Sequence, residues 1–174
     1  DVFADVVDER IDVGVRIGFL RDSRLVARKA GEVAFSLVAT PELVARLGAP
    51  RRVEDLVSLP VTALLDPNTG RIWSWYFAEG RQFTPEARTF VTDDPDAELG
   101  AILAGLAFGQ VPDYLAAPLV REGRLVELMR DQAPTPWDIY VYRPQRGPVP
   151  ARVRLVFDHI VSAVAEHQRA LHGH

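Results

Sequence analysis

The segment LAGLAFGQVPDYLA, Leu103 to Ala116, joins features of two element types in one short stretch. It begins as an apolar run typical of a helix end. It then passes, without a charged residue, into Gly109-Gln110-Val111-Pro112. A core strand favours Val and Ile, so a Gln amide there must find a hydrogen-bond partner or face water. The sequence leaves both possibilities open for Gln110: an amide paired with backbone, or a side chain in a wet cleft.

The residues around this segment predict a helix on either side of a short strand. Asp94 is the predicted N-cap of the preceding helix, and Pro95 suits its first position. The stretch 113–123 predicts the following helix, with Asp113 as its cap. The segment therefore reads as the middle of a helix–strand–helix unit.

The stretch TPELVARLGAP, residues 40–50, carries the most complete set of helix signals in the chain. Thr40 suits the N-cap, Pro41 the first position and Gly48 the left-handed exit, and Pro50 stops continuation. A short helical turn is expected next, within 51–56.

Extended segments alternate with these helices almost throughout. They are predicted at 11–18, 25–28, 33–39, 61–65, 108–112, 124–129 and 137–144, with a hairpin formed by 72–77 and 83–92. Val13, Val15 and Ile17 share one face of the first. Helices are also predicted over 1–9 and from Ala151 to about residue 171. This alternation predicts an α/β fold.

Composition excludes several classes of function. The net charge of −4 argues against nucleic-acid binding by this part of the protein, because phosphate recognition needs a positive surface. The chain has no cysteine, which excludes disulfides and thiolate chemistry and fits a reducing compartment. No apolar run is long enough to span a bilayer, and no secretory signal is recognisable.

The motifs of catalysis and cofactor binding are absent. Neither a Gly-x-Ser-x-Gly elbow nor a Gly-rich phosphate loop occurs, so we predict no enzymatic activity, no catalytic residue and no cofactor. No metal site is expected either. The histidines fall on the last predicted helix and its end without metal-ligand spacing: His159, His167, His172 and His174.

Two further groups of side chains have both a functional and a structural interpretation. The acidic residues within 93–98 could bind a cation, but carboxylates at a helix start more often stabilise the helix dipole. Trp73 and Trp75 could stack on a ligand, although packing of one face on a core is the favoured interpretation.

Six segments in order carry a family resemblance: IDVGVRIG, DSRLVARKAG, VATPELVARLGAPRRVEDL, AILAGLAFGQVPDYLA, EGRLVELM and IYVYRP. Their succession resembles the regulatory domain of LysR-type transcriptional regulators, from Asp1 to about His167. One position departs from the family's AGLG pattern, which reads AGLA here, with Ala107 in place of the last Gly. We do not expect that change to alter the fold.

The resemblance implies a two-lobed module similar to type 2 periplasmic binding proteins, with the first lobe incomplete. Residues 1–34 and 139–174 would form the first lobe and 35–138 the second, with strands near 33–39 and 139–142 as the hinge. A winged helix-turn-helix domain, absent from this chain, would provide all contact with DNA. The rival interpretation is a solute-binding protein of a transport system, which shares the architecture.

The resemblance also implies the partners. A small-molecule effector, with an organic acid among the candidates, would bind between the lobes, and the protein would form a homodimer or higher homo-oligomer without membrane contact. The expected location is cytoplasmic. The helix over 1–9 and the one over 96–107 are the candidate interface elements.

Ligands in open α/β sheets lie beyond the carboxyl ends of the strands. That rule selects these candidate ligand-binding residues: Arg16, Ile17, Gly18, Ala39, Thr40, Thr92, Asp93, Gln110 and Val111. The Thr40 side is favoured for an anion, because Asp93 and Asp94 would oppose one at the other helix start. Thr40 could also be a helix cap alone.

Overall fold

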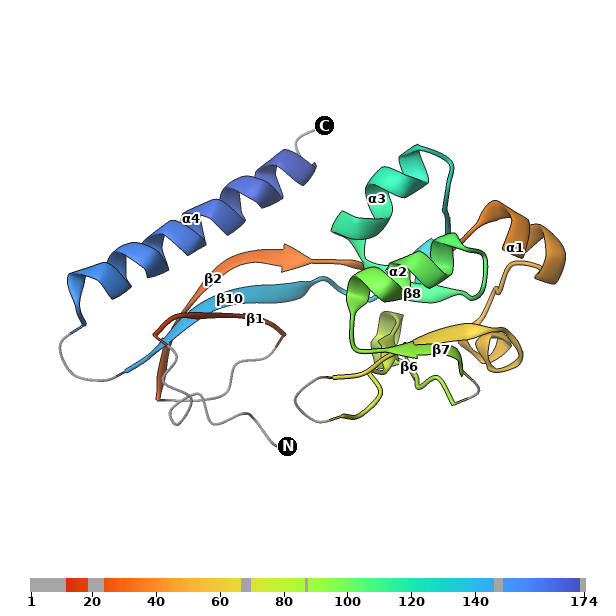
Figure 1. Ribbon diagram of the computed structural model, residues 1–174, viewed down its shortest axis with the longest axis horizontal. Helices are drawn as coiled ribbons and strands as arrows, with labels where there is room; N and C mark the ends of the chain where they lie inside the picture. Colours follow the sequence, from red (N-terminus) through yellow and green to blue (C-terminus); the bar gives the residue numbers. More distant parts are fainter. Residues whose placement is uncertain (1–11, 19–23, 67–69, 87, 146–148, 173–174) are drawn as a thin grey trace. The chain divides into compact units, whose positions relative to one another are not determined.

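The computed structural model describes residues 12–18, 24–66, 70–86, 88–145 and 149–172 (Figure 1). The predicted helix over 1–9 lies outside these ranges. The chain divides into two compact units. Unit 1 comprises residues 1–33 and 136–174, and unit 2 comprises residues 34–135. The predicted α/β character is evident in both units.

Unit 2 is organised around five strands: β3 (Phe35–Ala39), β4 (Val61–Leu64), β7 (Arg88–Thr92), β8 (Gly109–Pro112) and β9 (Val126–Leu128). β3 lies between β8 and β9, and β4 pairs with β7. A parallel bridge between Val61 and Phe108 joins the two groups, so the strand order is β9-β3-β8-β4-β7. All of these segments lie within strands predicted from the sequence, although β7 pairs with β4 and not in the predicted hairpin.

β3 runs against the other four strands. It pairs antiparallel with β8, Leu37 opposite Gln110, and antiparallel with β9, Leu37 opposite Leu128. β4 and β7 pair in parallel, with Leu64 opposite Thr92. The start of β3 therefore lies at the edge where β4, β7 and β8 end, and the end of β3 lies at the opposite edge.

Both faces of this sheet are covered, because side chains alternate between the faces of a strand. Val38 packs with residues of α2 (Pro95–Leu103) and α3 (Asp113–Arg121) on one face. Leu37 and Ala39 pack on the other face, beneath α1 (Pro41–Leu47) and η1 (Val53–Ser58). Leu37, Val38 and Ala39 are at most 3 % exposed, so β3 is the centre of unit 2.

A short hairpin of β5 (Trp75–Tyr76) and β6 (Gln82–Phe83) adds to the second face. The Trp75 ring packs on Phe83 at 5.4 Å and is 2 % exposed, which supports the core interpretation of this tryptophan. The predicted second hairpin strand over 83–92 is wrong in its extent. Pro85 separates β6 from β7, because proline cannot donate to a strand ladder, and β7 pairs with β4 instead.

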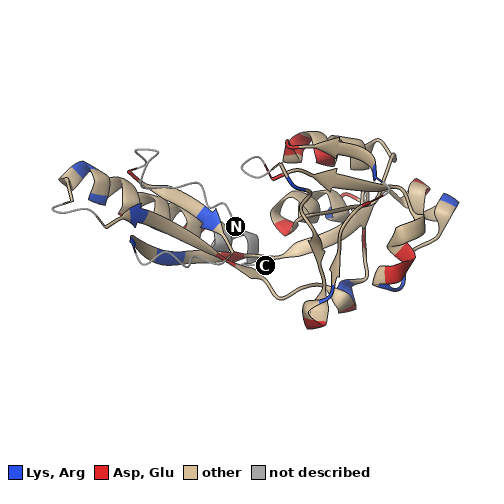
Figure 2. Ribbon diagram, turned by 90° about the horizontal axis from the view of Figure 1, so that it is seen from below, with Lys and Arg blue, Asp and Glu red and all other residues tan. Residues whose placement is uncertain are grey.

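Unit 1 is an antiparallel sheet of β1 (Gly14–Ile17), β10 (Trp137–Pro144) and β2 (Leu25–Val33), in that order. α4 (Ala151–His172) covers one face of it. Phe157 of α4 packs with Ala30 and Val141, with further apolar residues of α4 around them, as its predicted amphipathic pattern requires. Basic residues are spaced along α4 (Figure 2).

Three local predictions are corrected. β2 extends from Leu25 to Val33 rather than ending near Arg28, because β10 pairs with it along its length despite its charged positions. A break at Ala34 divides the predicted strand over 33–39 between the two sheets. Asp113 is the first residue of α3 and does not cap it, since Pro112 holds the N-cap position.

The helices differ from membrane spans. None of the helices in the described part of the chain is both long enough and apolar enough to cross a bilayer.

Gly109 allows close packing between β8 and α2. A Cβ atom there would meet the Ile102 side chain and lie 2.9 Å from Thr62 Oγ1. We predict that Gly109→Ala lowers the free energy of unfolding by about 1–3 kcal/mol, the usual cost of overpacking a core, measured by urea denaturation.

Gly100→Ala is the control, because Gly100 lies in α2 and a Cβ atom there meets nothing within 4 Å. It should raise stability by about 0.5–1 kcal/mol, since alanine is the better helix residue. Equal stability of Gly109→Ala and the native chain would contradict the packing of α2 on β8.

Candidate functional site

The structure separates the predicted ligand-binding residues of unit 2 into two groups. Thr92 and Asp93 lie at the edge of the sheet where β4, β7 and β8 end, which we call the effector edge. Ala39 and Thr40 lie at the opposite edge, because β3 runs antiparallel to β8. The carboxyl-end rule grouped them with Thr92 only because the direction of β3 was not known.

Hydrogen bonds at the effector edge occupy the start of α2. Thr92 Oγ1 accepts from the Asp94 N–H at 3.0 Å, and Asp94 Oδ1 accepts from Asp96 N at 2.9 Å and Ala97 N at 3.4 Å. Glu98 N donates to the Asp94 carbonyl at 3.0 Å, and Pro95 has no N–H. The first turn therefore offers no unsatisfied donor to a carboxylate, and its acidic residues act as caps.

The side chain of Gln110 pairs with backbone. Its Oε1 accepts from the Tyr76 N–H at 2.9 Å, and its Nε2 donates to the Tyr76 carbonyl at 2.8 Å. The amide thus continues the hydrogen bonding of a strand and fastens β5 to β8. The structure shows the backbone-paired alternative for this amide, and a contact between Gln110 and an effector stays a prediction.

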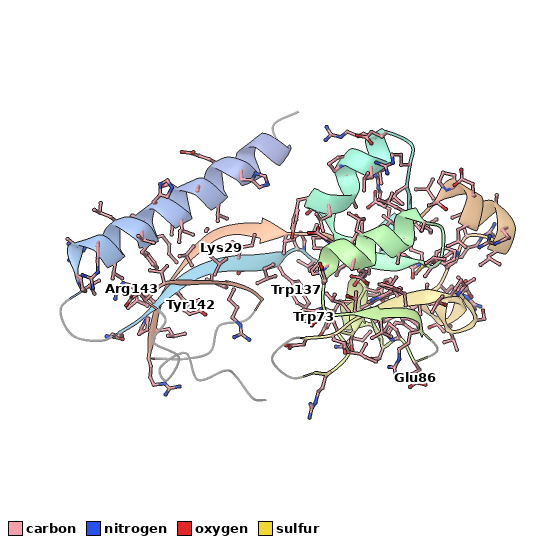
Figure 3. All side chains as sticks on the ribbon, in the orientation of Figure 1. Lys29, Trp73, Glu86, Trp137, Tyr142 and Arg143 are labelled. Atoms are coloured by element: carbon pink, nitrogen blue, oxygen red, sulfur yellow. The ribbon has the colours of Figure 1, made fainter. Side chains whose placement is uncertain are left out.

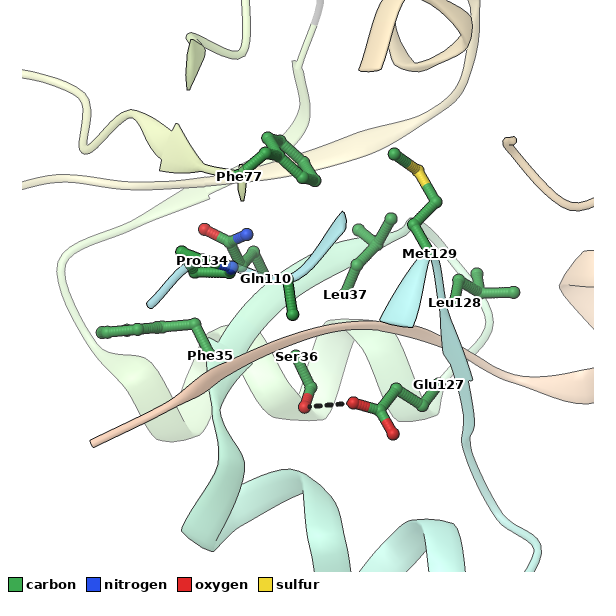
Figure 4. Close-up of a pocket in the computed structure, with 10 residues that line it drawn as sticks. Phe35, Ser36, Leu37, Phe77, Gln110, Glu127, Leu128, Met129 and Pro134 are labelled. Atoms are coloured by element: carbon green, nitrogen blue, oxygen red, sulfur yellow. Dashed lines mark hydrogen bonds between the residues drawn. The ribbon is translucent and has the colours of Figure 1, made fainter. Parts of the chain in front are cut away.

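A small cavity lies beside Gln110, with a volume of about 10 Å³ (Figure 4). That space holds about one water molecule. Ser36 Oγ donates to Glu127 Oε1 at 2.9 Å at its border, and Arg130 Nε donates to Glu127 Oε2 at 2.8 Å. The start of β3 thereby carries a polar group that the sequence did not single out.

Two other predicted residues are core components. Val111 is 1 % exposed and packs with Val38 and Ile102 between the sheet and its helices. Ala39 is fully buried in the cluster on the other face. Their side chains fix the sheet rather than present a surface to a ligand.

A buried carboxyl group links α2 to β4 near the effector edge. Glu98 on α2 is 2 % exposed, and Thr62 Oγ1 on β4 lies 2.6 Å from its Oε1. Burial raises the pKa of Glu98, and the hydrogen bond from Thr62 offsets this only in part. The sequence groups Glu98 with the acidic residues at the helix start, as a dipole-stabilising or cation-binding carboxylate. Its spacing to Ala101 and Ile102, one helical turn on, is the signal that indicates a buried face.

The predicted residues of unit 1 lie at the end of β1. Gly18 has φ +92° and donates its N–H to the Asp138 carbonyl at 2.9 Å. Arg16 pairs with Tyr140 across the sheet, and Ile17 is 36 % exposed. Val15 is also exposed, so the predicted apolar face of β1 is only partly covered.

A charged network adjoins Gly18. Lys29 (labelled in Figure 3) has its Nζ 2.6 Å from both Asp138 Oδ1 and Glu32 Oε1. Tyr140 donates its hydroxyl to Asp138 Oδ2 at 2.8 Å. Bonding to Lys29 and Tyr140 lowers the pKa of Asp138. The sequence did not reveal this group, because its members come from β2 and β10, more than a hundred positions apart.

Metal chemistry finds no support in the described ranges, where no three His, Asp or Glu side chains converge as ligands. For the acidic residues within 93–98, the structure supports the favoured capping interpretation at Asp94, and it places Glu98 in the core.

Comparison with known proteins identifies relatives. The family model described as the LysR substrate binding domain matches residues 1–165. The HTH-type transcriptional regulator PtxR of Pseudomonas aeruginosa is 33% identical over 159 residues, covering 88% of this chain and 49% of the relative. The chain spans about half the length of the curated relatives it matches.

Solved structures of LysR-type regulators superpose on this chain. The regulatory domain of AphB from Vibrio vulnificus superposes with a TM-score of 0.71 at 30% identity, over 87% of this chain and 74% of that one. CrgA of Neisseria meningitidis gives a TM-score of 0.75 at 22% identity, over 94% and 56% respectively, which supports the fold.

We predict that Gln110→Ala lowers the free energy of unfolding by about 1–3 kcal/mol, because both backbone groups of Tyr76 lose their partner. Chemical denaturation measures the change. Gln82→Ala, at an exposed position of β6, is the control and should have little effect. A Gln110 variant as stable as the control would show that the amide does not fasten β5.

A second prediction concerns the pH dependence of stability. The raised pKa of Glu98 means that its carboxyl is neutral in the folded state at a pH where the unfolded group has ionised. Its stabilising contribution is present below the unfolded pKa and is lost as the pH rises through the folded value.

Glu98→Gln keeps the acceptor for Thr62 without ionising. The variant should match the native chain near pH 4 and become the more stable of the two towards neutral pH, in thermal melts across this range. Glu54→Gln, at an exposed residue of η1, controls for net charge. A pH-independent difference between Glu98→Gln and the native chain would contradict the buried state of Glu98.

Proposed function

Because this chain belongs to the LysR substrate-binding-domain family, we propose that it senses a small-molecule effector and thereby modulates DNA binding and transcription by the intact regulator. The resemblance seen in the sequence is confirmed, and the family is non-enzymatic, in line with the prediction of no catalytic site. The family match also disfavours the rival interpretation as a solute-binding protein for transport.

The observation that supports a ligand site in unit 2 is the reversed direction of β3. It brings the ends of β4, β7 and β8 together with the start of β3, which is where ligands of open α/β sheets lie. Polar groups gather at this edge: the Thr92 hydroxyl, the exposed Asp93 and the Ser36–Glu127 pair.

The chemistry of the effector edge limits the effector. The N–H groups of the first turn of α2 are occupied by Thr92 and Asp94, and the charged side chains at this helix start, Asp93, Asp94 and Asp96, are all acidic. A carboxylate there would meet repulsion without donors. The part of the effector that faces Thr92 and Asp93 therefore carries hydroxyl or ammonium donors, and any carboxylate of an organic acid points elsewhere.

Effector binding would shift the balance between conformations of the regulatory domain, in proportion to its difference in affinity for them. In a homodimer or higher oligomer this shift would change the spacing of the DNA-binding domains. α2 stays a proposed interface element, and the proposed hinge strands are β3 and β10.

A thermal-shift screen of this chain against small polyols, amines and carboxylates tests the proposal. We expect polyol or amine ligands to raise the melting temperature. Asp93→Asn should reduce the shift produced by an amine, since it removes the facing negative charge. Glu86→Gln neutralises an exposed carboxylate before β7, at the other edge, and should leave the shift unchanged (Figure 3).

Stabilisation by carboxylates alone, with no effect of Asp93→Asn, would contradict the assigned effector chemistry. A panel without any stabilising compound would contradict effector binding by this chain.

A further inference from the structure

A groove lies in unit 2 at the edge opposite the effector edge, where β3 ends. It is bordered by α1 and by the turn that follows α2, and its volume is about 200 Å³. Drug-sized ligands occupy pockets of about 300–1,000 Å³, so this groove suits a shorter molecule. We call it the Thr40 groove.

Two leucines belong to the lining of the Thr40 groove. Leu43 of α1 is 1 % exposed and belongs to the core cluster beneath it, and Leu103 is half-buried at the end of α2. Because Leu43 is almost fully covered, the apolar side chain that a ligand can cover here is Leu103, at about 25 cal/mol per Å² of apolar surface removed from water.

Two hydrogen-bond donors border this apolar surface. The Thr40 side chain is 6 % exposed, and its Oγ1 accepts from the Leu43 N–H at 3.2 Å. Within the described residues, no acceptor takes the hydroxyl hydrogen of Thr40. A buried donor without an acceptor is costly, and a ligand oxygen would satisfy it.

The second donor is the Arg46 guanidinium. Its Nη2 makes one long bond, 3.4 Å, to the Gly105 carbonyl. No carboxylate of the described chain lies within ion-pair distance of Arg46, and Glu42, one turn earlier on the same helix, is exposed. A planar guanidinium with most of its donors unused is suited to a carboxylate.

Gly105 keeps the groove accessible. Its φ of +67° favours glycine, and a Cβ there would lie 3.3 Å from Thr40 Oγ1. Any larger residue would both strain the turn and crowd the hydroxyl. The turn after α2 thus leaves Thr40 open on the side that faces the groove.

We propose that the Thr40 groove binds a short aliphatic monocarboxylate, separately from the effector edge. Its carboxylate contacts the Arg46 guanidinium and the Thr40 hydroxyl, and its alkyl chain lies against Leu103. The two edges of the sheet thus carry different chemistry: the effector edge holds the acidic start of α2, and the opposite edge holds a donor-lined groove.

Titration of the isotope-labelled chain with hexanoate, followed by amide NMR, tests this site. The Thr40 and Gly105 amide signals should shift and saturate. Hexanamide, uncharged and of the same length, should bind at least several-fold more weakly. Signals of Thr92 and Asp94 report on the effector edge independently, so failure at one site is distinguished from failure at the other.

Variants assign the contacts. Arg46→Gln should weaken hexanoate binding about two- to fivefold, the effect of losing one exposed ion pair. Glu42→Gln should strengthen binding, because it removes a negative charge from the border. Thr40→Ser keeps the hydroxyl and the helix cap and should retain affinity. Arg121→Gln, at the exposed end of α3, should change nothing.

Equal affinity for hexanoate and hexanamide would overturn the proposal, as would an unchanged affinity in Arg46→Gln. Hexanoate shifts confined to signals outside the Thr40 groove would also overturn it.

Discussion

The antiparallel insertion of β3 between β8 and β9 is the constraint on which unit 2 depends. Leu37, Val38 and Ala39 are buried on both faces of the sheet, so the strand holds together the two apolar clusters on its sides. Its direction also decides which loops share an edge. A parallel β3 would have brought Thr40 beside Thr92; the antiparallel one separates them and gives each its own surroundings.

Gln110 links this strand order to the rest of unit 2. Gln110 lies on β8, opposite Leu37 of β3. Its side-chain amide hydrogen-bonds the N–H and the carbonyl of Tyr76, as the backbone of a neighbouring strand would do. On the other face, Gly109 allows α2 to approach β8 closely enough for Glu98 to reach Thr62. In the segment 103–116, Gln110 attaches the β5–β6 hairpin to the sheet and Gly109 admits α2.

Much of the fold could be predicted from local signals. The caps Thr40 and Asp94, each followed by proline, placed α1 and α2 correctly because capping depends on neighbouring residues alone. The direction of β3 and the pairing of β7 with β4 depend on contacts between distant segments, which periodicity does not encode. For the same reason the sequence did not reveal the Lys29–Asp138 and Thr62–Glu98 pairs. The carboxyl-end rule grouped Thr40 with Thr92, whereas the direction of β3 places Thr40 at the opposite edge of the sheet.

The central claim is that effector binding in unit 2 takes place where β3 begins and β4, β7 and β8 end. Amide hydrogen exchange of the chain, with and without a saturating effector, tests it most directly. The account predicts slower exchange in residues 92–94 and 35–36, with 104–106 unchanged. Protection confined to 104–106, with exchange at 92–94 unaltered by the effector, would contradict it.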